Sequence, residues 1–146
     1  MPRGWVVVLI LICVALNGAG FLWNLFEPIP LYDEIAHFLT PFTLVAILAE
    51  IIYRNGGDDD FFNTPRRAVI TGSVIGLVGA AGWEVIEVIL DLMGFPISHA
   101  PLDTIFDVVL GVAGGAAGAA GAWAADRYLD RLFNRSRIDA HRQRVR

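Results

Sequence analysis

The sequence contains no lysine and only one cysteine, Cys13. A single cysteine excludes an intramolecular disulfide and a metal cluster built from cysteines. The chain also lacks a polar stretch long enough for a soluble domain, since 55% of its residues are apolar and the mean hydropathy is +0.57. These values argue against a soluble globular protein.

Four apolar segments divide most of the chain, and each approaches the ~20 residues that cross a hydrocarbon core. They cover residues 5–26, 35–53, 68–90 and 104–125. A lone strand would leave its backbone polar groups unpaired in lipid, so these segments should be helices. We therefore expect an all-α polytopic protein, a four-helix transmembrane bundle over residues 1–126 with a basic tail over 127–146. The apolar run resumes at Phe21, which favours a retained first helix over a cleaved signal peptide.

Basic residues mark one end of the four spans. All eleven are arginines, and they stand at Arg3, Arg54, Arg66, Arg67 and seven positions after residue 126. Because short cytoplasmic loops carry the positive charge, both termini should be cytoplasmic in a multi-pass protein of the inner membrane. The arginine-rich tail should attract anionic lipid at that surface. Nucleic acid is not an expected partner, since no aromatic platform accompanies the tail.

Small residues recur one turn apart on the last two spans. They are Gly72, Gly76 and Ala80 on the third span, and Gly111 with Gly115 and Gly114 with Gly118 on the fourth. This spacing is typical of helices that pack closely in a bilayer, and it also allows a homo-oligomer. The glycines are not a nucleotide-binding loop, because no strand or phosphate-binding lysine accompanies them. A polar and small stripe also follows the first span, at Cys13, Asn17, Gly20 and Asn24.

Acidic and histidine side chains continue the small-residue faces at the end opposite the arginines. The set consists of Asp33 and His37 on the second span, Glu84 and Glu87 on the third, and Asp103 and Asp107 on the fourth. The members of each pair are three or four residues apart, so each pair shares a helical face. Most of them lie one or two turns inside their spans, and we expect them to converge near one level of the bundle.

This convergence predicts a divalent-cation site. An ionisable side chain inside a span costs ~2.5–3.5 kcal/mol even on the insertion scale, and it marks a functional site by default. Five carboxylates at close quarters need protons or a metal to offset their repulsion. Oxygen ligands with one imidazole suit Zn²⁺, Mn²⁺, Fe²⁺ or Mg²⁺. The expected metal ligands are His37, Glu84, Glu87, Asp103 and Asp107.

In an enzyme, Asp33 and His37 would form the catalytic pair, with Asp33 orienting the imidazole or acting as a base. Plainer interpretations stand beside this one. Asp33 can cap the second helix, and Asp103 can be a solvated residue at the membrane surface. His37 can pack as a neutral residue bonded to a neighbouring acid. Glu84, Glu87 and Asp107 are harder to explain in this way, because they lie within the spans.

Three motifs follow one another along the chain. They are Asp33-x-x-x-His37-Phe38, Glu84-x-x-Glu87 and Asp103-Thr104-x-x-Asp107. In this order, over about residues 32–118, they resemble the VanZ-like superfamily, and most closely its YjdF-like branch of uncharacterised inner-membrane proteins. The resemblance implies a small multi-spanning protein with envelope or lipid-linked substrates. The chain departs from the VanZ pattern at Glu34, where those proteins often have lysine, so their antibiotic resistance is not carried over.

The residues leave three functions open. The first is a metal-dependent membrane enzyme acting on an envelope lipid or a phosphate ester. The second is a proton- or cation-coupled transporter, which would need an oligomer because four short spans are few for a transport path. The third is a non-catalytic membrane component whose polar cluster locks the helices together. No nucleophilic serine or cysteine lies near the cluster, and a cation site is common to the first two functions.

Overall fold

The computed structural model describes residues 3–26, 28–55, 60–94 and 101–144, and within these ranges the side chains of residues 4 to 128. Its helices are α1 (Arg3–Trp23), α2 (Tyr32–Arg54), α3 (Pro65–Leu92) and α4 (Pro101–Arg144). Each contains a segment long and apolar enough to cross a membrane. The described residues form no strand. The predicted all-α architecture with four spans is therefore confirmed.

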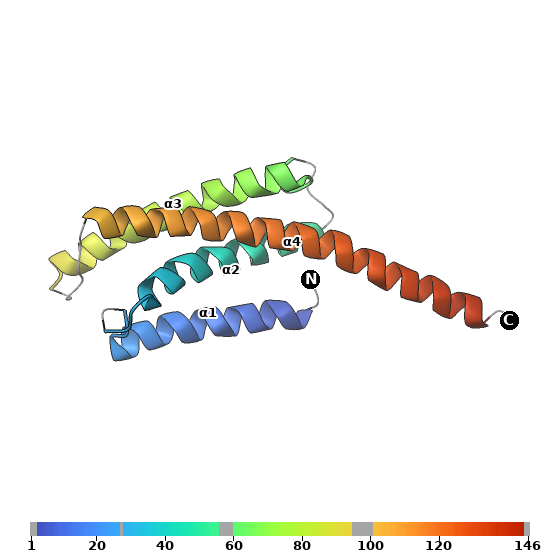
Figure 1. Cartoon of the computed structure of the whole chain (residues 1–146), viewed down its shortest axis with the longest axis horizontal. Coiled ribbons are helices and arrows are strands. Elements are labelled where there is room, and N and C mark those ends of the chain that lie inside the picture. Colours follow the sequence, from blue (N-terminus) through green and yellow to red (C-terminus); the bar gives the residue numbers. More distant parts are fainter. Residues whose placement is uncertain (1–2, 27, 56–59, 95–100, 145–146) are drawn as a thin grey trace.

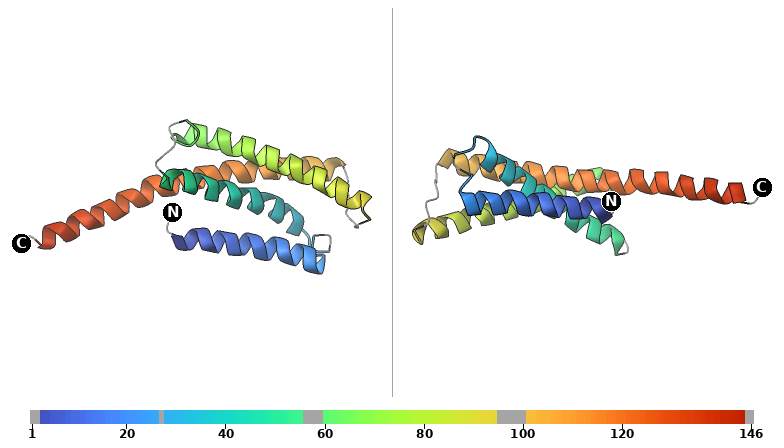
Figure 2. Two further views of the ribbon diagram at one scale, coloured as in Figure 1. Left: turned by 180° about the vertical axis from the view of Figure 1, so that it is seen from behind. Right: turned by 90° about the horizontal axis from the view of Figure 1, so that it is seen from below.

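The helices lie side by side, with α4 between α2 and α3 and with α1 against the outer side of α2 (Figure 1, Figure 2). The start of α1, the end of α2, the start of α3 and the far end of α4 lie at one end, which is the arginine-rich end. The opposite end contains the predicted acidic cluster, and we call it the acidic end. Which of the two faces the cytoplasm stays a prediction from the charge distribution.

Glycines allow the backbones of α3 and α4 to touch. A Cβ atom on Gly72 would overlap with the carbonyl oxygen of Gly115. One on Gly76 would overlap with the carbonyl oxygen of Gly111. Residue numbers rise on one helix as they fall on the other, so the two helices are antiparallel. The predicted packing of small residues is confirmed at this contact.

A second pair of glycines on α4 faces α2. Gly114 lies against the carbonyl group of Phe38, and four residues later Gly118 lies against that of Phe42. Equal steps in the same direction show that α2 and α4 run parallel in a fixed register. Lipid tails are as apolar as the helices, so close van der Waals contact of this kind is what favours helix association in a bilayer.

The largest fully buried side chains lie towards the arginine-rich end. They are Phe62 and Val45, which pack against small residues of α2, α3 and α4. The hydroxyl of Tyr53 donates to the carbonyl oxygen of Phe62 at 2.8 Å, which holds the segment before α3 against α2. Glu50 is buried in the same region and accepts from Nε of Arg54 at 2.7 Å. This acid is therefore charge-paired and separate from the acidic end.

Two features of the helix ends differ from what the sequence suggests. The interpretation of Asp33 as the helix cap is wrong, because the capping position is Leu31, in the left-handed conformation with φ 64° and no side-chain cap. Asp33 is the second residue of α2, where its charge favours the positive end of the helix dipole. At the other end, α4 continues as a helix through most of the predicted tail to Arg144 (Figure 2).

Replacing Gly115 with alanine should destabilise the bundle, because the added Cβ would overlap with the carbonyl oxygen of Gly72. Overpacking a tight contact costs about 1–3 kcal/mol, so we expect a lower midpoint in thermal unfolding of the detergent-solubilised protein. The matched control is Gly79→Ala on the exposed side of α3, where nothing lies within 4 Å of the added atom. Equal midpoints for the two variants would contradict the close contact of α3 with α4.

Candidate metal centre

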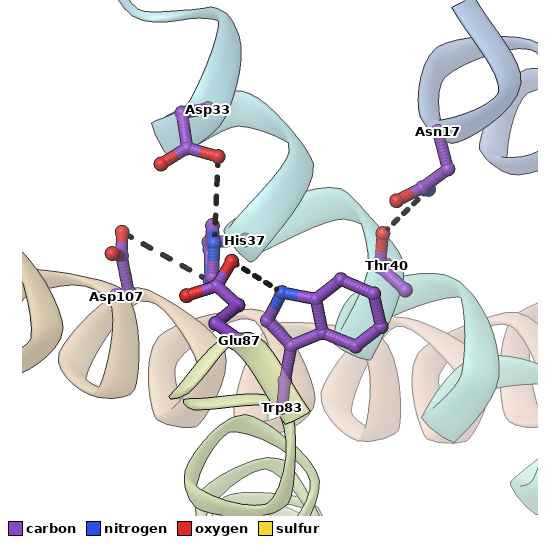
Figure 3. Close-up of polar contacts among 7 residues, drawn as sticks. All are labelled: Asn17, Asp33, His37, Thr40, Trp83, Glu87 and Asp107. Atoms are coloured by element: carbon purple, nitrogen blue, oxygen red, sulfur yellow. Dashed lines mark hydrogen bonds and ion pairs between the residues drawn. The ribbon is translucent and has the colours of Figure 1, made fainter. Parts of the chain in front are cut away.

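His37 lies between two carboxylates at the acidic end (Figure 3). Its Nε2 is 3.5 Å from Oδ1 of Asp33, and its Nδ1 is 3.9 Å from Oδ1 of Asp107. One ligand atom from each of the three residues lies within 4.8 Å of the other two. The structure thus brings together three of the six predicted site residues, from α2 and α4, and we call them the ligand triad.

Helical spacing and glycine packing together place the ligand triad. Asp33 and His37 are four residues apart on α2, so they project from the same face. The contact of Gly114 with Phe38, the residue after His37, holds α4 close to α2 just beyond the site. Asp107 lies two turns before Gly114 on α4, and its side chain reaches the imidazole across this narrow interface.

Glu84 approaches the same level from α3. Ala80 packs against Gly111, and one turn further outward the antiparallel register sets Glu84 opposite Asp107. Glu84 is 9% exposed and Asp107 is 3% exposed. Among the described residues, one buried carboxylate oxygen on each of these two acids has no hydrogen-bond partner. Such atoms are costly to bury unless a proton or a cation pairs with them.

A tryptophan that did not stand out as a site residue in the sequence holds Glu87. The indole Nε1 of Trp83 donates to Oε1 of Glu87 at 2.8 Å (Figure 3). Trp83 also makes an edge-to-face contact with Phe21 of α1, with ring centroids 5.9 Å apart. Figure 3 shows Glu87 beside His37, so the indole positions an acid next to the ligand triad. The spacing of four residues between Trp83 and Glu87 is the signal that could have revealed this role.

The polar stripe of α1 contacts α2 rather than the ligand triad. Nδ2 of Asn17 donates to Oγ1 of Thr40 at 2.9 Å (Figure 3). The hydroxyl of Tyr32 donates to the carbonyl oxygen of Leu16 at 2.6 Å. These bonds attach α1 to α2 beside the site without supplying an acidic group to it.

Asp103 lies outside the ligand triad. It is exposed in the first turn of α4, one turn before Asp107. It shares a helical face with Asp107, so its carboxylate adds to the acidic character of this end. The structure therefore places Asp103 on the face of α4 that carries Asp107, but not among the grouped ligand atoms.

The two aspartates of the ligand triad need more positive charge than a neutral His37 provides. A neutral imidazole has a single N–H group, so it can donate to one of its two neighbouring carboxylates but not to both. The separations of 3.5 and 3.9 Å are also longer than ordinary hydrogen bonds. Either a proton on His37 or a bound cation can supply the missing charge. The nitrogen and oxygen donors suit Zn²⁺, Mn²⁺, Fe²⁺ or Mg²⁺.

Comparison with known proteins places the chain in a family of membrane proteins. The family model described as a predicted membrane protein, DUF2238, matches residues 1–129. The chain belongs to this family. The DUF2238 match includes the ligand triad, Glu84 and Glu87, and it reaches the end of the fourth candidate span. No curated protein and no solved structure matches the chain significantly.

Membership of DUF2238 confirms the membrane-protein prediction at the level of the family. The finer resemblance to the VanZ-like superfamily and its YjdF-like branch stays a prediction from the three motifs.

Neutralising Glu84 should stabilise the protein in the presence of a chelator. Among the described residues, Oε1 of Glu84 is buried without a hydrogen-bond partner, and an unsatisfied buried polar group costs roughly 1–3 kcal/mol. An amide in its place has N–H groups that can donate to a neighbouring carboxylate. We expect Glu84→Gln to raise the midpoint of thermal unfolding, and the exposed-acid control Asp91→Asn on the same helix to change it little. A lower midpoint for Glu84→Gln would show that the carboxylate makes a stabilising contact, against this description of the site.

Proposed function

We propose that the acidic end of this membrane protein holds a divalent cation at His37 and Asp107, with Asp33 orienting the imidazole. The observation that carries the proposal is the ligand triad, whose three donor atoms lie within 4.8 Å of one another inside candidate membrane spans. Among the described residues, Oδ1 of the buried Asp107 has no hydrogen-bond partner, and a cation would satisfy it. A cation would also offset the repulsion between Asp107 and Glu84.

The two sides of the imidazole favour different roles for the two aspartates. A histidine that binds a metal usually donates its other N–H to a carboxylate or a carbonyl group, which fixes the ring. Asp33 is the closer carboxylate and the less buried one, so it suits the orientation of His37 through Nε2. Nδ1 of His37 and Asp107 then share the cation, with Glu84 and Glu87 as further carboxylate ligands at the same level.

We further propose that the cation serves an enzyme acting on an envelope lipid or a phosphate ester in the inner membrane. A cluster of carboxylates repels phosphate unless a cation intervenes, and a bound cation also polarises the phosphoryl oxygen. The VanZ-like resemblance favours the same class of substrate.

Purified protein should bind Zn²⁺ or Mn²⁺ at one equivalent, as measured by elemental analysis after dialysis and by titration calorimetry. Asp107→Asn removes a charged ligand and should weaken binding by at least about tenfold. The control Asp91→Asn removes an exposed acid near the same end of α3 and should bind as the wild type does. Absence of metal from the wild type after incubation, or equal affinities of the two variants, would contradict the cation site and favour a proton relay.

The enzymatic part of the proposal has its own readout. Metal-loaded protein should release phosphate from a lipid phosphate, and chelation or Asp107→Asn should abolish the release. If the protein binds metal but hydrolyses neither a lipid phosphate nor a soluble phosphate ester, the proposed cation site stands and the proposed enzymatic role is contradicted. Cation flux in proteoliposomes would then test the transporter.

A further inference from the structure

A cavity of about 310 Å³ lies at the arginine-rich end, at the opposite end of the bundle from the ligand triad. Its lining residues are Asn63, Thr64 and Pro65 at the start of α3, with Trp123, Arg127 and Tyr128 on α4. The volume equals roughly ten times the ~30 Å³ that a water molecule occupies in the liquid. The cavity therefore has room for a small polar group together with part of the molecule that carries it.

The polar lining of this cavity combines the guanidinium of Arg127 with hydroxyl groups and the side-chain amide of Asn63. Nη2 of Arg127 donates to the carbonyl oxygen of Asn63 at 3.3 Å, and the indole of Trp123 donates to the same oxygen at 3.4 Å. A guanidinium group has five N–H donors, so this bond orients Arg127 and leaves several donors for a ligand. The hydroxyls of Thr64 and Tyr128 add two more.

Arg127 is the charged side chain among the described residues that line the cavity, and none of those described residues is acidic. Thr64 also caps α3, accepting a hydrogen bond from the amide of Arg67 at 3.2 Å. The positive end of the 28-residue helix dipole thus adds to the potential of Arg127 at the cavity wall.

The depth of the cavity in the membrane identifies the class of ligand. The candidate span of α3 begins at Pro65, and on α4 the apolar run gives way to Asp126 and Arg127. Pro65 and Arg127 line the cavity, so it lies where the apolar core gives way to the headgroup layer. Tryptophan and tyrosine are typical of this level. Lipid phosphates lie at the same level, and the parallel N–H groups of arginine suit phosphate oxygens.

We propose that this cavity is a phosphate-binding site, in which Arg127 binds the phosphate oxygens and the aromatic pair Trp123 and Tyr128 flanks the molecule that carries them. The chemistry fits the headgroup of an anionic phospholipid and also free phosphate. The site is independent of the cation at the acidic end. It differs from a general attraction of lipid to the arginine-rich tail, because it assigns the binding to one arginine and one cavity.

The test is retention of phosphatidylglycerol by the full-length protein in native mass spectrometry, with diacylglycerol as the lipid that lacks phosphate. Arg127→Gln should weaken retention roughly tenfold, because it removes the charge-assisted bonds. The matched control is Arg66→Gln, which removes the same charge from the exposed first turn of α3, outside the described lining. Arg127→Lys keeps the positive charge but loses the parallel N–H groups of the guanidinium. It should therefore bind phosphatidylglycerol with an intermediate affinity.

Inorganic phosphate as a competitor separates the two sources of the ligand. Displacement of phosphatidylglycerol by millimolar phosphate supports a site for the phosphate group alone, whereas retention supports a lipid headgroup site that needs the attached glycerol. Equal retention by wild type and Arg127→Gln would overturn the proposal. An equal loss in Arg66→Gln, or equal binding of diacylglycerol, would overturn it as well. Thermal unfolding of each variant shows whether a loss of binding reflects a loss of fold.

Discussion

The close contact of α4 with both of its neighbours is the constraint on which the rest of the structure depends. Gly111 and Gly115 let its backbone meet that of α3, while Gly114 and Gly118 let it meet that of α2. These contacts fix the register of all three helices, because glycine is the residue that admits a backbone at this distance. The acidic end follows from that register. The register places Asp107 near His37 of α2 on one side and at the level of Glu84 of α3 on the other.

The sequence predicts most of this architecture because membrane helices leave few alternatives. The lengths of the apolar runs give four spans, and the one-turn spacing of glycines identifies the faces that pack. Those faces lead to the acids, so the convergence of His37 and Asp107 follows from periodicity alone. The detail at helix ends does not follow. Leu31 adopts a left-handed conformation, so α2 begins at Tyr32 and includes Asp33. Leucine is not a residue type from which such a capping conformation can be predicted.

Other parts of both sites depend on distances across the bundle that spacing cannot supply. Asp103 and Asp107 share a motif and a face, yet one is exposed and the other is buried, because α3 and α2 cover α4 only beyond its first turn. The cavity beside Arg127 forms where the start of α3 meets α4, more than 60 residues apart in the chain, and its shape is a product of packing.

The measurement that tests the central claim most directly is X-ray absorption spectroscopy at the metal edge of the Zn²⁺- or Mn²⁺-loaded protein. Our account expects a shell of nitrogen and oxygen atoms at about 2.0–2.2 Å with the multiple scattering of one imidazole, and the loss of that imidazole signal in His37→Asn. A shell of water oxygens alone, or an imidazole signal that His37→Asn leaves unchanged, would show that the metal binds elsewhere and would contradict the site built around His37 and Asp107.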